Sequence, residues 1–145
     1  MLKVNFHNPG YYPDCGLTYV IIGARHNNSW VFIKHKHRKG YELPAGHINT
    51  GEDADIAARR ELTEETGAVT FKISCLATYT VSDQAGTRAG RLYYSEIEKF
   101  GAKRDDNEVE EIIFTDSLPE NLSFPYIQKV LFDFLNFKTR GNTHG

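Results

Sequence analysis

Three glutamates with helical spacing are the residues of this sequence best suited to chemistry. Glu61, Glu64 and Glu65 stand at i, i+3 and i+4, which places side chains on one face of an α-helix. Three carboxylates on one face repel each other, so the pattern indicates a neutralising cation. Hard oxygen ligands suit Mg²⁺ or Mn²⁺ better than Zn²⁺, which prefers His and Cys. Considered alone, an acidic run is more often a solvated helix face.

The segment around these glutamates carries the signals of a helix start and a helix end. Thr50 and Asp53 can cap the first turn, and Asp55 is favourable within it. Gly67 stands where the end of a helix commonly needs a left-handed residue. We therefore expect a helix over residues 53–66. Its packing side would be formed by Ala54, Ala57, Ala58 and Leu62.

The rest of the chain reads as strands followed by a second helix. Apolar residues at helical spacing after Pro125 predict a helix over residues 125–137. Residues 1–16 are expected to be irregular and residues 82–90 to form a loop. Apolar and β-branched runs predict strands over residues 17–23, 30–34, 41–43, 71–81, 91–97 and, entered from an acidic loop, 108–115.

Length and composition limit the class of protein. The 145 residues are enough for one domain with its own core, and the net charge is −2. Without a basic field, a nucleic-acid partner is not expected. The sequence has no run of about 18 apolar residues, so no membrane span is expected. Cys15 and Cys75 are too few for a disulfide framework, which favours a reduced, cytoplasmic protein.

A basic segment, residues 35–39, precedes the acidic helix. By itself such a run is more often a solvated connection. Next to a cluster of acids it can also bind phosphate, because a fixed cation stabilises charge that develops on a transferred phosphoryl group. His35 and His37 have no third soft ligand nearby in sequence, so a metal site built on them is not expected.

The acidic segment resembles the signature of the Nudix hydrolases. Gly46 is followed after five residues by Glu52, and after seven more by the run Arg-Glu-Leu-Thr-Glu-Glu-Thr-Gly that begins at Arg60. Each fixed position of the signature is present over residues 46–68. The last position, usually a larger aliphatic residue, is Ala68.

This resemblance implies a fold. We expect an α/β protein with the Nudix fold, an α/β/α sandwich around a mixed β-sheet. A single Nudix domain would occupy residues 1–137, and residues 138–145 would form a disordered tail. Members of the family often dimerise, and the sequence itself shows no interface, so a monomer and a homodimer both remain open.

The resemblance also implies the chemistry. Nudix enzymes hydrolyse a diphosphate linked to a nucleoside or similar group, with Mg²⁺ or Mn²⁺ as cofactor. Glu52 and Arg60 would form an ion pair that orients the helix and the preceding loop. The groups expected to hold the metals are the side chains of Glu61, Glu64 and Glu65 and the backbone carbonyl of Gly46.

A carboxylate is also needed to take the proton of the attacking water. Glu64 is the first candidate. In several members of the family the base comes from a later loop, and the acids available there are Glu108, Glu110 and Glu111. Of these we favour Glu108 and, after it, Glu111.

The surrounding segments look most like MutT-type enzymes, which convert nucleoside triphosphates, including oxidised purine forms, to the monophosphate and pyrophosphate. His35, Lys36 and Arg38 would then contact the phosphates of the nucleotide. An aromatic side chain could stack on the base, although packing in a strand is the more common role for each one. The candidates are Tyr79, Tyr93, Tyr94 and Phe114.

Three other functions remain open. An ADP-ribose or nucleotide-sugar pyrophosphatase would usually carry a proline some 16 residues after the signature, and this chain has none between Ala68 and Leu118. Removal of pyrophosphate from RNA 5′ ends gains little support from the net charge. A catalytically silent, nucleotide-sensing Nudix module would usually have lost the glutamates that are intact here.

Overall fold

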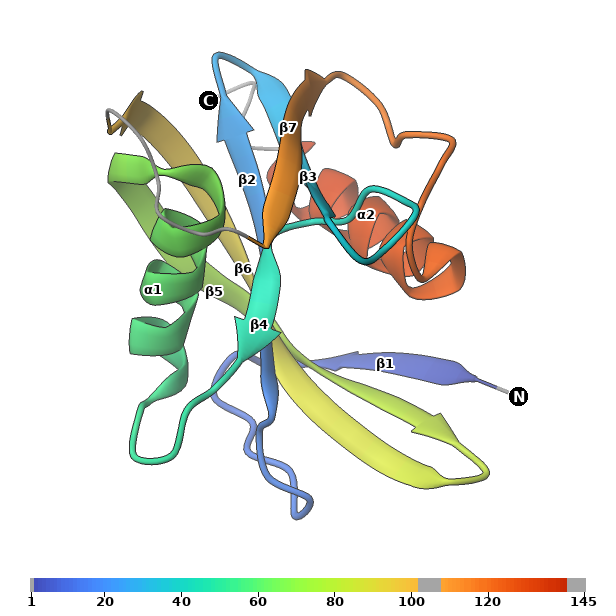
Figure 1. Cartoon of the computed structure of the whole chain (residues 1–145). Coiled ribbons are helices and arrows are strands. Elements are labelled where there is room, and N and C mark those ends of the chain that lie inside the picture. The colour runs from blue at the N-terminus through green and yellow to red at the C-terminus, as the bar shows by residue number, and fades with distance from the viewer. Residues whose placement is uncertain (1, 102–107, 141–145) are drawn as a thin grey trace.

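The computed structural model describes residues 2–101 and 108–140, in which seven strands form one sheet between two helices (Figure 1). The strand order is β1-β5-β6-β2-β3-β7, with β4 paired to β2. Strands β2 and β6 run parallel, and the other pairs are antiparallel, so the predicted mixed sheet is confirmed. The elements are β1 Lys3–His7, β2 Tyr19–His26, β3 Ser29–His35, β4 Ala45–His47, α1 Ala54–Thr66, β5 Ala68–Asp83, β6 Gly86–Phe100, β7 Val109–Thr115 and α2 Pro125–Thr139.

Each face of the sheet carries its own core. Successive side chains of a strand point to opposite faces, so Val20 and Ile22 of β2 pack under α1. Ile21, between them, joins Leu131 and Leu135 of α2 on the other face. The two helices therefore cover opposite faces, which confirms the expected sandwich (Figure 1).

Helix α1 begins and ends where its local signals predict. The Asp53 carboxylate accepts a hydrogen bond from the Ile56 N–H at 2.9 Å, which caps the first turn. Gly67 adopts φ 82°, and its N–H donates to the Thr63 carbonyl, which closes the last turn. Helix α1 carries Glu61, Glu64 and Glu65, so the caps at its two ends fix the stretch of backbone from which these side chains extend.

Strands β2 and β3 separate directly after their shared turn, and β4 lies in the gap. The two strands pair only at Arg25–Trp30 and His26–Ser29, within the described residues. Beyond these pairs, Ile33 of β3 bonds to Glu42, and Ile21 of β2 pairs with Ala45. The prediction of a strand over 41–43 followed by a turn was therefore wrong in detail, because the chain continues past Pro44 as β4.

The hairpin of β5 and β6 is longer than predicted. Residues 82–90 do not form a loop, since the strands pair up to Asp83 and Gly86. This end of the hairpin is polar because it extends beyond the helices, and its polar side chains bond across the strands. Ser82 and Thr87 hydroxyls lie 2.9 Å apart, and Arg88 lies 3.3 Å from Asp83.

Both ends of the chain contain more regular structure than expected. Residues 3–7, predicted to be irregular, form β1, which pairs with β5 along the register Lys3–Ser82 to His7–Thr78. At the other end, α2 extends to Thr139, past the predicted boundary at 137. Residues 141–145 of the expected tail lie outside the described residues. None of the described helices has the length and apolar character needed to cross a membrane.

Candidate active site

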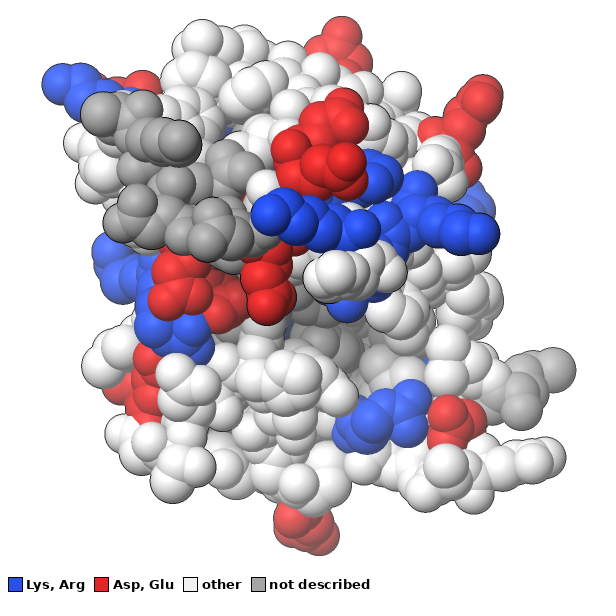
Figure 2. All heavy atoms as spheres, in the orientation of Figure 1, with Lys and Arg blue, Asp and Glu red and all other residues white. Residues whose placement is uncertain are grey.

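A cleft of about 700 Å³ lies where β4, the N-terminal end of α2 and the β5–β6 hairpin meet. Its acidic end is lined by Glu61 and Glu65 of α1 together with Gly46 of β4. Arg38 and Arg88 contribute positive charge. Figure 2 shows Lys and Arg side chains gathered in a band beside Asp and Glu side chains on this side of the molecule. One cleft therefore combines acidic and basic groups.

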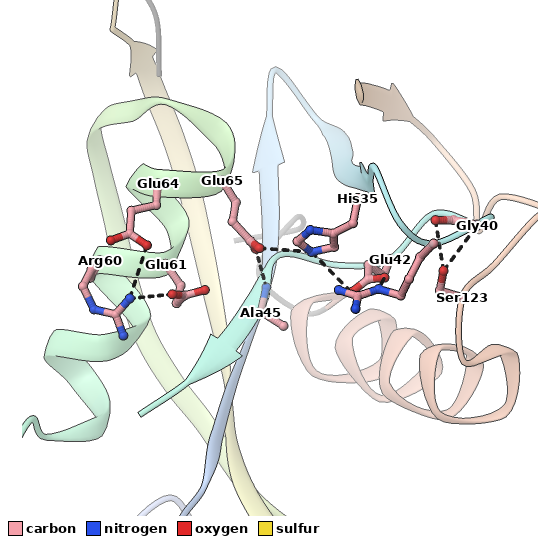
Figure 3. A network of polar contacts seen from close by, with 10 residues as sticks. His35, Gly40, Glu42, Ala45, Arg60, Glu61, Glu64, Glu65 and Ser123 are labelled. Atoms are coloured by element: carbon pink, nitrogen blue, oxygen red, sulfur yellow. Dashed lines mark hydrogen bonds and ion pairs between the residues drawn. The ribbon is translucent and has the colours of Figure 1, made fainter. Parts of the chain in front are cut away.

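Arg60 neutralises the acidic face of α1. Its Nη1 donates to Glu61 at 2.5 Å and lies 3.3 Å from Glu64 (Figure 3). Its Nε and Nη2 donate to the two oxygens of Glu52 at 2.8 and 2.9 Å. Nη2 also donates to the His47 carbonyl at 3.0 Å. The expected ion pair of Glu52 and Arg60 is present, and the same guanidinium relieves the repulsion between Glu61 and Glu64.

Glu65 points away from this group, towards β4 and the basic segment (Figure 3). Its carboxylate accepts the Ala45 N–H at 2.8 Å and lies 3.2 Å from His35 Nε2. The same ring nitrogen lies 3.7 Å from Glu42. His35, which was expected to contact phosphate, is thus engaged with two buried acids, and its contact with Glu65 raises the pKa of His35.

The two acids that line the acidic end of the cleft, Glu61 and Glu65, have raised pKa values. Burial and, after it, the neighbouring Glu65 raise the pKa of Glu61 to about 7 against the opposing effect of Arg60. Burial also raises the pKa of Glu65, which is only 4% exposed. Glu52 behaves differently, because its hydrogen bonds from Arg60 lower its pKa to about 2. The pKa values of both Glu61 and Glu65 are raised, so a cation bound beside these carboxyls would favour their charged forms.

Gly46 leaves the space in which the Glu61 carboxylate lies. A Cβ built on Gly46 would overlap the carboxylate of Glu61, so only glycine allows strand β4 to approach this acid so closely. Carboxylates and a backbone carbonyl are the oxygen ligands that Mg²⁺ and Mn²⁺ accept. The groups present therefore fit a divalent cation.

In the described residues, no three acidic, His or Cys side chains already converge as a metal site. The reason is visible in Figure 3, where Glu61 and Glu64 face Arg60 while Glu65 faces His35. The i, i+3, i+4 spacing correctly places the three acids along one stretch of helix, but it does not determine where their oxygens point. A cation at Glu61 and Glu64 would compete with Arg60 for the same oxygens.

The basic segment contributes fewer phosphate contacts than expected. Arg38 bonds Glu42 through Nε at 2.7 Å and Nη2 at 3.1 Å, yet it remains on the wall of the cleft. Lys36 is exposed and is not among the described residues that line the cleft. Arg88 does line it and was missed, because residues 82–90 were interpreted as a loop rather than as strand.

The three acids near the start of β7 differ in their surroundings. Glu108 lines the cleft. Glu110 is bonded to Lys34 at 2.6 Å, and Glu111 accepts the Tyr41 hydroxyl at 2.8 Å. Neither Glu110 nor Glu111 is among the described residues that line the cleft, so Glu108 is the one of the three that lies where a substrate can reach it.

Of the aromatic candidates, Tyr79 is the one found in the lining of the cleft, and it is 3% exposed. Tyr93 donates instead to Asp55 of α1, and Tyr94 packs beside Trp30. Phe114 packs against Phe100. Aromatic residues that were not anticipated also line the cleft, namely Tyr19 and Phe124.

Replacement of Arg60 tests whether its guanidinium neutralises the acids. Arg60→Gln is expected to lower the Tm by several degrees in metal-free buffer, because Glu52, Glu61 and Glu64 lose their shared partner. Added Mg²⁺ should raise the Tm of this variant more than that of the unmodified protein. Arg59→Gln serves as the control, because it removes the charge of an exposed arginine on the same helix. Equal Tm values for Arg60→Gln and the control without metal would contradict this assignment.

Comparisons with known proteins identify the family of this domain. Residues 18–125 match the NUDIX domain. YtkD of Bacillus subtilis (strain 168), named "Putative 8-oxo-dGTP diphosphatase", is 34% identical over 115 residues, which are 77% of this chain and 72% of YtkD. An RNA pyrophosphohydrolase of Caulobacter vibrioides is 32% identical over 68 residues, which are 46% of this chain and 38% of that protein.

Similarity also extends to a solved structure. The crystal structure of the Bacillus subtilis pyrophosphohydrolase BsRppH matches with a TM-score of 0.77 at 25% identity, over 94% of this chain and 90% of that chain. The region that matches the NUDIX domain, residues 18–125, includes the whole of helix α1 and Gly46 of strand β4. The match to the NUDIX domain and the 34% identity to YtkD over 77% of this chain show that the chain belongs to the Nudix hydrolase family.

Proposed function

We propose that this Nudix pyrophosphohydrolase converts a nucleoside 5′-triphosphate, ordinary or oxidised, to the monophosphate and pyrophosphate. The observation that carries the proposal is the cleft, which joins the acids of α1 to a wall with aromatic and apolar residues. The first part suits a metal-bound polyphosphate and the second suits a base. The 34% identity to YtkD adds support for a nucleotide of this kind.

Nudix hydrolases generally use divalent metals, and we assign Mg²⁺ or Mn²⁺ to the acidic end. Glu61, Glu64 and Glu65, with the Gly46 carbonyl, would hold the metal. When bound, it would neutralise phosphate charge and lower the pKa of a water molecule. Arg60 would keep Glu61 and Glu64 oriented through its bonds to Glu52. His35 would act as a positioning residue, because it holds the second oxygen of Glu65.

The remaining charged groups are assigned to the substrate. Glu108 and Glu64 are the two candidates to accept the proton of the attacking water. Arg38 and Arg88 stand on the walls of the cleft, where their charge can bind the phosphates farther from the metal. Arg38 is held by Glu42, so its direction is set before the substrate arrives.

A second candidate is the removal of pyrophosphate from a 5′-triphosphorylated RNA. It is favoured by the likeness to the Caulobacter RNA pyrophosphohydrolase over 68 residues. The acidic end would serve both substrates equally, because both carry a triphosphate on a 5′ carbon. The two functions differ in what lies beyond the sugar of the first nucleotide. A free triphosphate has solvent there, whereas an RNA substrate continues as a polynucleotide chain.

A product assay distinguishes these functions. Purified protein with Mg²⁺ or Mn²⁺ is given nucleoside triphosphates, 8-oxo-dGTP, ADP-ribose, a nucleotide sugar and a triphosphorylated oligoribonucleotide. Release of pyrophosphate from free triphosphates is the expected result. Turnover of the oligonucleotide with none of the free triphosphates would assign the RNA function. Turnover of ADP-ribose or the nucleotide sugar alone would refute both.

Chelation provides a separate prediction. Excess EDTA should abolish pyrophosphate release, and Mg²⁺ or Mn²⁺ in excess over the chelator should restore it, because the carboxylates of α1 alone repel a polyphosphate. Far-UV circular dichroism with EDTA should be unchanged, since Arg60 and His35 compensate the acids without metal. Full activity in EDTA would remove the metal from the reaction.

A further inference from the structure

Gln128, in the first turns of α2, has one end of its side-chain amide fixed by the backbone. Its Oε1 accepts a hydrogen bond from the Leu43 N–H at 2.9 Å. A backbone N–H can only donate, so the oxygen must face Leu43 and the NH₂ group must face the other way. The two side-chain donors of Gln128 are therefore oriented by a residue 85 positions distant in the sequence.

The donor end of this amide faces the cleft. Gln128 is 4% exposed and lines the cleft. Among residues 2–101 and 108–140, its side-chain nitrogen has no hydrogen-bond partner. This nitrogen is not one of the fully buried side-chain atoms that lack a partner, which among the described residues are Arg25 Nε and Arg91 Nε, so the donor is open to the cleft. A ligand that supplies an acceptor at this place would satisfy the group.

The surroundings of Gln128 suit a flat, largely apolar ligand. Ile21, Val81 and Ile127 line the same cleft. Phe124, at its rim, is 56% exposed and adopts φ 54°, a left-handed conformation that is uncommon for an aromatic residue. Such backbone strain concentrates at functional positions. Phe124, whose ring centroid lies 5.6 Å from Arg38 Cζ, lines the same cleft as Gln128.

The segment that carries Gln128 is firmly attached to the rest of the cleft. The Ser123 hydroxyl donates to the Gly40 carbonyl at 3.1 Å and accepts the Gly40 N–H at 3.2 Å (Figure 3). Tyr41 forms backbone hydrogen bonds with Asn121 and Ser123. The donors are therefore held in place before a ligand binds, which is the condition for strong discrimination between ligands.

We infer that Gln128 donates a hydrogen bond to a keto oxygen of the substrate's purine base. This inference rests on the proposed function, which makes the ligand a nucleotide. The matching acceptor is the 6-keto oxygen of hypoxanthine or guanine. Adenine carries a 6-amino group instead, so donor would face donor. An 8-keto oxygen of an oxidised purine offers the same chemistry from another edge of the base.

The test compares ITP with ATP, which differ in the 6-substituent. The unmodified protein is expected to give a kcat/KM for ITP at least about tenfold above that for ATP, the effect of one hydrogen bond made or lost at a donor held in a fixed direction. Gln128→Glu keeps an oxygen for the Leu43 N–H and replaces the donor by an acceptor. The ITP-to-ATP ratio should fall at least about tenfold in this variant.

Two further comparisons locate the keto group and control for side effects. The ratio of kcat/KM for 8-oxo-dGTP to that for dGTP, measured with the unmodified protein and with Gln128→Glu, reports on the 8-position. If Gln128→Glu lowers this ratio and leaves the ITP-to-ATP ratio unchanged, the keto oxygen that Gln128 contacts is the one at the 8-position. Lys129→Gln changes an exposed residue of the same helix and should leave both ratios unchanged. If neither ratio changes in Gln128→Glu, Gln128 does not recognise the base.

Failure of the proposed function would look different. If no free triphosphate is hydrolysed, binding of the α,β-methylene analogues of GTP and ATP is measured by calorimetry. A preference for the guanine analogue that disappears in Gln128→Glu would support the role of Gln128 although the proposed reaction had failed. Equal binding of both analogues by the unmodified protein would exclude the 6-keto oxygen, and equal binding of 8-oxo-dGTP and dGTP as well would overturn the inference itself.

Discussion

Replacing Glu64 by glutamine is expected to lower kcat by about 10²–10⁴-fold, the range measured when a group that handles the proton of a reaction is removed. The substitution keeps the size and shape of the side chain and removes its charge. If Glu64 holds the metal or accepts the proton, the loss occurs in the chemical step, so KM should change much less than kcat.

The fold should survive this substitution. The Glu64 side chain is 51% exposed, and its ionic partner among the described residues is Arg60, 3.3 Å away at i,i+4 spacing. Such exposed pairs are worth about 0.3–0.5 kcal/mol, so the Tm should barely change. Asp133→Asn removes one exposed charge from α2 and is the matched control for kcat. Near-normal turnover by a folded Glu64→Gln protein would exclude Glu64 from the mechanism.

The parts of this site that the sequence predicts are those set by short-range signals. Asp53 and Gly67 cap α1 through bonds within a few residues, so the helix boundaries follow from local chemistry. The pairing of Glu52 with Arg60 also lies within one short segment. By contrast, the oxygens of Glu61 and Glu65 take different directions because Arg60 and His35 compete for them, and His35 belongs to a different strand.

The parts that the sequence does not predict depend on contacts between distant segments. Polar residues such as Ser82 and Thr87 signal a loop locally, yet they pair across a hairpin that extends past the helices. Arg88 comes to the cleft only through that pairing. Gln128 would be interpreted as one polar residue of an amphipathic helix, and only its bond to Leu43 shows which end faces the cleft.

Gly46→Ala is the second prediction with a large effect. The added Cβ would overlap the Glu61 carboxylate, so that the acid must move or β4 must shift. A displacement of about 1 Å in an active site can cost about 10²-fold in rate, and we expect at least this loss in kcat/KM. Overpacking of this kind costs about 1–3 kcal/mol of stability, which leaves a protein of this size folded at room temperature.

Two further variants separate the local effect from general destabilisation. Gly10→Ala adds the same methyl group where no atom lies within 4 Å, and its activity should match that of the unmodified protein. Glu61→Asp combined with Gly46→Ala shortens the overlapped side chain by one methylene, so the Tm should recover relative to Gly46→Ala alone. Activity should not recover with it, because the shorter acid no longer reaches its former position. Recovery of both together would mean that Gly46→Ala acts through stability, and that close approach of β4 to Glu61 is not itself required for the reaction.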